Sequence, residues 1–84
     1  MIENPNALWD KTLLFIKRNV SEQQFSTWFK PIGFESFNED SKVLVLRVPS
    51  PFYAEYLEEN YIDLLANVLV KNFGQGIKLN YRVL

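Results

Sequence analysis

The chain is short and nearly neutral, with 84 residues, 9 Lys and Arg against 10 Asp and Glu, and a net charge of −1. This length allows one small domain, and the charge balance excludes the broad basic field of a dedicated duplex-DNA binder. The absence of cysteine and histidine excludes disulfides, conventional zinc sites and histidine-activated nucleophiles. We therefore expect residues 1–84 to form one non-enzymatic domain, cut from a longer protein, with no catalytic residue, metal or cofactor of its own.

No segment has the character of a targeting or membrane sequence. The first ten residues include two acidic residues and no basic residue, which is not the pattern of a signal peptide. Every unbroken apolar stretch is far shorter than the roughly 18 residues that a membrane span needs. We expect a cytoplasmic protein without a membrane partner.

The first predicted helix covers about residues 5–19. Asn4 and Pro5 combine an N-cap with a proline at the first helical position, which is a favoured pairing. Apolar residues at helical spacing predict the buried face, and they are Trp9, Leu13, Ile16 and Val20.

The second predicted helix, about residues 22–29, is short and has an aromatic face. Ser21 and Gln24 fit a capping box, in which each side chain accepts a hydrogen bond from the other residue's backbone N–H. Aromatic residues follow at i, i+3 and i+4, and they are Phe25, Trp28 and Phe29. Pro31 ends the helix.

The remaining sequence predicts a hairpin, one long helix and a final strand. The hairpin joins strands near residues 32–37 and 42–48 through the turn formers at 38–41. A serine cap and a proline then open a helix that we expect to run unbroken over residues 51–72. Residues 77–83 alternate between apolar and polar, as in a half-buried strand with a basic outer face. The order α-α-β-β-α-β predicts an α+β domain with helices packed on a three-stranded sheet.

Seven residues are expected to form the core or framework of this domain. They are Phe25, Trp28, Pro31, Leu44, Leu46, Leu57 and Tyr61. The acidic residues of the long helix, Glu55, Glu58, Glu59 and Asp63, predict a solvated helix face, and the alternative is a docking face for a basic partner.

Three segments of the chain resemble the amino-terminal domain, domain I, of the DnaA family of bacterial replication initiators. They are Leu8-Trp9, the run Ser21 to Pro31 with its F-x-x-W-F-x-P pattern, and Val48-Pro49-Ser50-Pro51-Phe52 leading to Tyr61. The resemblance covers nearly the whole chain, and its segments are specific in combination. It implies a K-homology-like fold and an interaction module, with ATP binding and duplex-origin recognition in later domains. The chain itself has no G-x-x-x-x-G-K-[ST] phosphate loop.

The resemblance also implies partners and the residues that contact them. The partners are a second copy of the chain in a weak homodimer, the replicative helicase DnaB and species-specific initiation regulators at the nucleoid. The resemblance assigns self-association to Leu8 and Trp9, and the alternative for Trp9 is a core role. The resemblance assigns contact with the helicase and the regulators to Glu22, Gln24 and Phe52. Gln24 stands where the family can carry a glutamate, and the alternatives are a pure helix cap for Gln24 and a core position for Phe52.

A second hypothesis is weak binding of single-stranded DNA. Four basic residues, Lys42, Arg47, Lys78 and Arg82, are expected to share the outer face of the sheet, with Tyr53 or Tyr56 nearby. Basic residues among aromatic ones suit single-stranded nucleic acid. The chain lacks the G-x-x-G loop with which K-homology domains bind well, so we expect weak, salt-sensitive binding at most.

Overall fold

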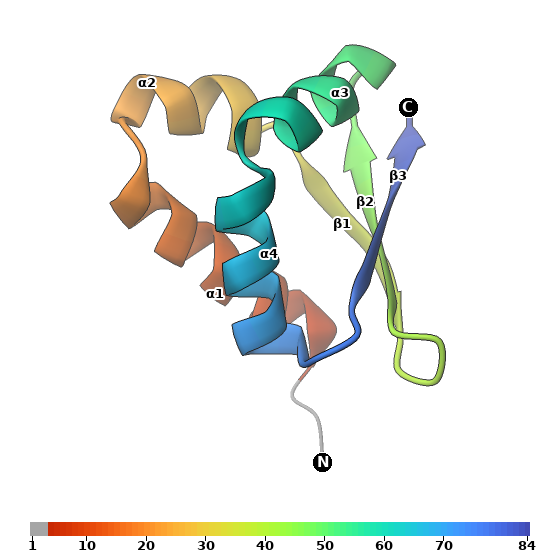
Figure 1. The fold of residues 1–84 in the computed structure, drawn as a ribbon. Helices are drawn as coiled ribbons and strands as arrows, with labels where there is room; N and C mark the ends of the chain where they lie inside the picture. Colours follow the sequence, from red (N-terminus) through yellow and green to blue (C-terminus); the bar gives the residue numbers. More distant parts are fainter. Residues whose placement is uncertain (1–3) are drawn as a thin grey trace.

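The computed structural model describes residues 4–84, and residues 1–3 lie outside the described part. The elements in chain order are α1 (Pro5–Asn19), α2 (Glu22–Gln24), the π-helix η1 (Phe25–Phe29), β1 (Gly33–Asn38), β2 (Val43–Val48), α3 (Pro51–Asn60), α4 (Ile62–Phe73) and β3 (Lys78–Val83). In Figure 1 the sheet stands on one side, α1 and α4 lie on the other, and α2 and α3 lie at the upper end. The predicted α+β class and three-stranded sheet are confirmed.

The sheet is mixed, with strand order β1-β2-β3. β1 and β2 form the predicted antiparallel hairpin, and β3 runs parallel to β2, with Val43 opposite Lys78 and Val48 opposite Val83. Because side chains alternate along a strand, β2 buries Leu44, Leu46 and Val48 on its inner side. The core therefore fills the space between the sheet and the helices, and the outer side of β2 carries Val43, Val45 and Arg47.

The predicted starts of the first two helices are confirmed by their caps. The Asn6 backbone N–H donates to Asn4 Oδ1 at 2.8 Å. Ser21 N–H donates to Gln24 Oε1 at 2.9 Å, and Gln24 N–H donates to Ser21 Oγ at 3.1 Å, which completes the capping box. Local side-chain chemistry thus determines where both helices begin.

Loss of the capping box should lower stability measurably. We expect Gln24→Ala to lower the free energy of unfolding by about 1 kcal/mol, because the Ser21 N–H loses its acceptor. Gln24→Glu keeps an acceptor at the same reach and is the matched control. Thermal denaturation should show a melting temperature roughly 4–8 °C lower for the alanine variant alone. Equal melting temperatures for the two variants would contradict the role of the cap.

Two features of the helices differ from the prediction. The second helix keeps its predicted span, but from Phe25 it widens into η1, where Lys30 N–H donates to Phe25 O at 2.9 Å. The long helix is broken at Tyr61, whose backbone (φ −128°, ψ 13°) leaves the helical region. The Tyr61 ring packs edge-on against Phe29, with 5.0 Å between centroids. This break separates α3 at the upper end from α4 along the sheet (Figure 1).

The expected core is largely confirmed, with corrections at its edge. Leu44, Leu46 and Leu57 are fully buried, whereas Phe25, Trp28 and Tyr61 are half-buried and pack against the core. Pro31 is exposed, because it ends the helix at the surface rather than packing beneath it.

Candidate functional site

An aromatic cluster joins η1 to α3 at the upper end of the molecule. Trp28 of η1 stacks on Tyr56 of α3, with 3.6 Å between ring centroids and 6° between planes. Tyr53 meets the same indole edge-on at 5.2 Å. Paired aromatic rings of this kind add roughly 0.5–1.5 kcal/mol beyond their burial. The cluster therefore holds two separate helical segments in a fixed relation.

Phe52 is the exposed member of this cluster. Its ring lies 6.0 Å from Trp28 and 6.4 Å from Tyr56, yet 59% of the residue is exposed. Pro51 begins α3 directly before it, so Phe52 falls in the first helical turn, where no further element covers it. The predicted Ser50 side-chain cap is wrong, since that side chain makes no capping bond. The alternative of a core position for Phe52 is also wrong.

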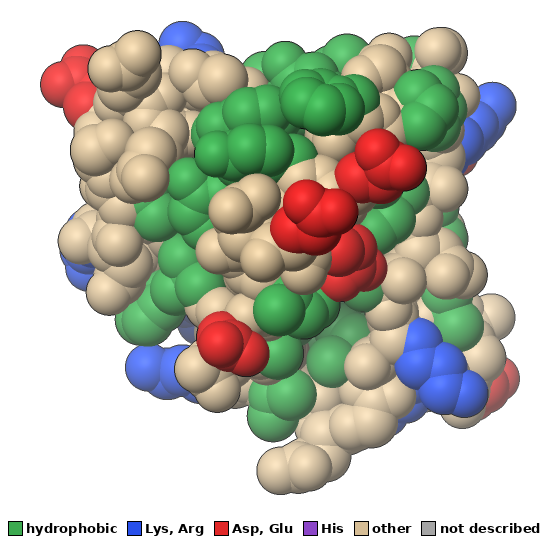
Figure 2. Space-filling view, turned by 45° about the horizontal axis from the view of Figure 1, so that its top comes forward, with side chains coloured by type: hydrophobic (Ala, Val, Ile, Leu, Met, Phe, Trp, Pro, Cys, Tyr) green, Lys and Arg blue, Asp and Glu red, His purple; other side chains and the backbone are tan. Residues whose placement is uncertain are grey.

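The surroundings of Phe52 are apolar and acidic. Figure 2 shows hydrophobic side chains gathered over the α2–α3 end of the molecule, with acidic side chains beside them. Glu55 and Glu59 lie three and seven residues after Phe52, which places them on the same side of α3. We call Trp28, Phe52, Tyr56 and Glu55 the α3 face. Such a face suits a protein partner that offers an apolar socket with basic groups around it.

Glu58 of α3 is linked to the sheet through Tyr81, whose hydroxyl donates to Glu58 Oε1 at 3.4 Å. Burial, and then the neighbouring Glu58 charge, raise the pKa of Tyr81 above the ordinary tyrosine value of 10.0. Burial, and then Tyr56, also raise the pKa of Tyr61. The folded protein therefore favours neutral tyrosines at these positions.

The raised pKa of Tyr81 predicts a pH dependence of stability. Above about pH 10 the unfolded chain loses the tyrosine proton while the folded chain keeps it, so the free energy of unfolding falls as the pH rises. We expect Tyr81→Phe to make this fall less steep, although Tyr61 still contributes in both proteins. Urea denaturation at about pH 8 and about pH 11 measures the slope, and equal slopes would contradict the assignment.

The other two residues predicted to contact the helicase do not lie with Phe52. Glu22 is exposed and lines a separate hollow with Lys17, Phe25, Ser26 and Lys30, on the side of α2 that faces α1. Gln24 is exposed, but its side-chain oxygen is bonded in the capping box. The structure thus brings Phe52 together with Trp28 and Tyr56, and leaves Glu22 and Gln24 outside that cluster.

Leu8 and Trp9, the residues predicted to mediate self-association, are both buried, and the alternative of a core role for Trp9 is confirmed. They are 5% and 3% exposed, and both belong to the core. The reason is that α1 packs against α4 and β1, which places its second turn inside the domain. The Trp9 indole N–H is buried without a hydrogen-bond partner among the described residues. Self-association itself stays a prediction, but these two side chains do not offer a surface for it.

The four basic residues do not form one free patch. Arg47 and Arg82 are register partners on the outer face, and both pair with Glu35, at 3.3 and 2.6 Å. Arg47 Nη2 also donates to the Phe34 carbonyl oxygen at 3.0 Å. Lys78 follows the same alternation on the outer face of β3.

Lys42 lies elsewhere, as do the aromatic residues expected near the basic face. Lys42 has a positive φ of 61° in the hairpin, and its ammonium lies beside Gly74 at the end of α4. Tyr53 and Tyr56 pack on Trp28 instead of lining the sheet. The outer face therefore carries three cations, two of which pair with one carboxylate, and no stacking platform from these tyrosines.

Within residues 4–84, no group of three or more acidic side chains is placed to hold a metal ion. The helices of this part of the chain are all too short or too polar to cross a membrane.

The fold and its exposed aromatic face define a small α+β domain of the kind used for contacts with other macromolecules. The DnaA N-terminal domain family model matches residues 6–71, and the chain belongs to this family. The chromosomal replication initiator protein DnaA of Flavobacterium psychrophilum is 41% identical over 83 residues, which is 99% of this chain. DnaA of Bacteroides thetaiotaomicron is 44% identical over 85 residues. The chain spans only 17% and 18% of the length of these two relatives.

A solved structure shows the same fold. The DnaA chain in the crystal structure of a HobA–DnaA (domain I-II) complex from Helicobacter pylori superposes with a TM-score of 0.75 and 16% identity. The match covers 94% of this chain and 99% of that one. The suspected relation to DnaA domain I and the predicted architecture are thereby confirmed.

Proposed function

We propose that this domain is the docking module of a DNA replication initiator and recruits the replicative helicase and initiation regulators through the α3 face. The observation that carries the proposal is Phe52, an exposed phenylalanine resting on the Trp28–Tyr56 stack. An aromatic side chain that is already held in place loses little conformational freedom on binding. A partner therefore gains apolar contact at Phe52 without first ordering the surface.

The comparisons support docking of proteins in general. The relatives are replication initiators, and the similar Helicobacter pylori domain is seen in a complex with HobA. On this proposal the module is not an enzyme, needs no cofactor and acts in the cytoplasm at the replication origin. It also associates weakly with itself, through a surface other than Leu8 and Trp9. ATP binding belongs to later domains of the full-length initiator.

Single-stranded DNA remains the second candidate ligand. Lys78 and the partly exposed Arg47 and Arg82 favour it, but Glu35 already pairs with two of these three cations and offsets one of their charges. Each phosphate contact contributes to a salt-sensitive affinity. With so few free positive charges, we predict weak binding.

A binding isotherm tests the proposal. Isothermal titration calorimetry of the 84-residue chain against the replicative helicase of the same genome should give a saturable heat in about 150 mM salt. A single-stranded oligonucleotide is titrated in parallel at low salt and at the same higher salt. Helicase binding that survives the higher salt supports docking through an apolar face. Binding of the oligonucleotide alone would overturn it.

A further inference from the structure

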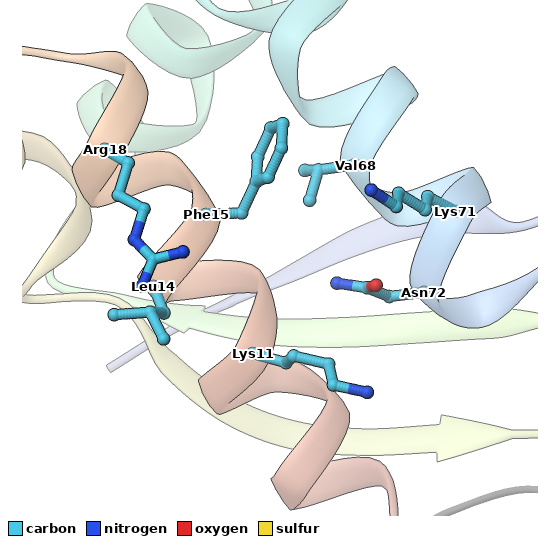
Figure 3. A pocket seen from close by; sticks show the side chains of 7 residues that line it. All are labelled: Lys11, Leu14, Phe15, Arg18, Val68, Lys71 and Asn72. Carbon is cyan, nitrogen blue, oxygen red and sulfur yellow. The ribbon is translucent and has the colours of Figure 1, made fainter.

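Helices α1 and α4 leave a groove of about 270 Å³ between them, and its rim is basic. Figure 3 shows Lys11 and Arg18 reaching from α1 and Lys71 from α4, with Phe15 and Val68 between the helices and Leu14 beside Arg18. Leu14 is 50% exposed although it is a large apolar residue. Among residues 4–84, no acidic side chain lines the groove. In a chain with a net charge of −1, the convergence of Arg18 and Lys71 at this rim marks a surface suited to an acidic partner.

The groove is held in shape by contacts between the two helices. Asn72 Nδ2 donates to the buried Thr12 Oγ1 at 2.9 Å, and Thr12 Oγ1 donates in turn to the Leu8 carbonyl oxygen at 2.8 Å. The Lys71 ammonium lies 5.5 Å from the centroid of the Phe15 ring. These contacts fix the spacing of α1 and α4, so the basic rim and apolar floor exist before any ligand binds.

The same chain carries a surface of the opposite character. Four acidic residues lie along α3 and at the start of α4, namely Glu55, Glu58, Glu59 and Asp63. Ile62, beside Asp63, is 41% exposed. Glu58 accepts a hydrogen bond from Tyr81, but among residues 4–84 the structure gives none of the four an ion pair. We call Glu59, Ile62 and Asp63 the acidic corner.

We propose that the basic groove of one copy of the chain binds the acidic corner of a second copy. Arg18 and Lys71 would face the carboxylates, and the exposed Ile62 would cover the exposed Leu14. The proposal rests on the self-association included in the proposed function, and gives it a surface that the buried Leu8 and Trp9 do not. In such a pair one copy keeps a free corner and the other keeps a free groove, so the contact is heterologous and propagates head to tail.

Nucleic acid is the less favoured occupant of the groove. Its phosphates would pair with the three cations, but bases need a free aromatic face on which to stack. The only aromatic ring in the lining is Phe15, and Lys71 lies over it. Leu14 and Val68 can pack against an apolar side chain, but they have no hydrogen-bond donor for a phosphate.

Charge reversal on each side of the contact tests the proposal in the 84-residue chain. Sedimentation equilibrium at about 20 mM salt gives the association constant. Lys71→Glu and Glu59→Lys should each lower it about tenfold, because reversal replaces an attraction with a repulsion. Lys78→Glu and Glu39→Lys change the net charge equally at exposed positions elsewhere, and should alter it less than about twofold. Circular dichroism checks that every variant is folded.

The decisive sample is an equimolar mixture of the two interface variants. Lys71→Glu retains a normal acidic corner and Glu59→Lys a normal groove, so the mixture should form a one-to-one heterodimer and no larger species. Failure to form it, or association of Lys71→Glu as tight as that of the original chain, would overturn the proposal while leaving helicase binding through Phe52 untouched. A chain that never associates would overturn both this contact and the self-association. Loss of oligonucleotide binding alone in Lys71→Glu would make the groove a nucleic-acid site and overturn the proposal.

Discussion

Replacement of Phe52 by alanine is expected to abolish most of the affinity for the helicase without unfolding the domain. The ring is 59% exposed, so little core packing is lost and the melting temperature should change by no more than about 3 °C. At the centre of an interface, truncation of an aromatic anchor costs about 2 kcal/mol or more, which corresponds to roughly 30-fold in the dissociation constant. Calorimetry of the folded variant against the helicase measures the loss.

A matched control is available on another surface. Leu14 is similarly exposed, at 50%, but lies in the groove of α1 and α4, so Leu14→Ala should leave helicase affinity within about twofold. Phe52→Leu, which keeps much of the apolar volume, should fall between the original chain and Phe52→Ala. Equal affinities for the original chain and Phe52→Ala would show that the helicase binds elsewhere.

The second large effect concerns Phe29, which is fully buried beneath the functional surface. Its ring packs against Phe25 at 6.4 Å and edge-on against Tyr61 at 5.0 Å. Truncation of a buried phenylalanine costs about 3–5 kcal/mol, whereas a domain of this length has only roughly 4–13 kcal/mol in total. We expect Phe29→Ala to lose a large fraction of this stability and to unfold at a much lower urea concentration than the original chain.

Urea denaturation followed by far-ultraviolet circular dichroism measures this effect. Phe29→Leu, which preserves most of the volume, should lose less than half as much stability. Phe25→Ala removes the same atoms from a half-buried position and should also cost less. A Phe29→Ala protein as stable as Phe25→Ala would contradict the assigned place of Phe29 in the core.

Much of the fold was predictable because local signals determine it. Asn4, Ser21 and Gln24 act within a few residues of their own positions, and the caps they predict are present. The alternation along β2 likewise predicts its buried side correctly. The break at Tyr61 was not predictable in this way, because two short helices keep the same apolar spacing as one long helix. A distant contact, with Phe29, accompanies the change of direction.

The candidate site was less predictable than the fold, because it depends on contacts between residues that are distant in the sequence. Phe52 is exposed because of the way the first turn of α3 lies against Trp28. The spacing of residues along the chain does not predict that arrangement. One signal for the cluster was present, since Tyr56 lies four residues after Phe52 and therefore on the same helical side.

The basic face was predicted only in part, because Lys42 lies elsewhere and one carboxylate pairs with two of the other three cations. Glu35 lies where the register of β1 against β2 shifts, between Phe34 and Ser36. It pairs with Arg47 from the adjacent strand and with Arg82 from the far edge strand. A bulge of this kind re-aims a side chain, and a strict alternation of residues along β1 does not predict it. The groove of α1 and α4 was not predictable for a similar reason, since its cations come from helices 50 or more residues apart in the sequence.

The most direct test of the docking role is an amide-shift titration of the isotope-labelled chain with the replicative helicase from the same genome. The α3 face predicts that perturbed amides group at residues 25–29 and 51–56, on the two segments joined by the Trp28–Tyr56 stack. Perturbations confined to β3 and the outer face of the sheet, or none at saturating helicase, would contradict recruitment through Phe52.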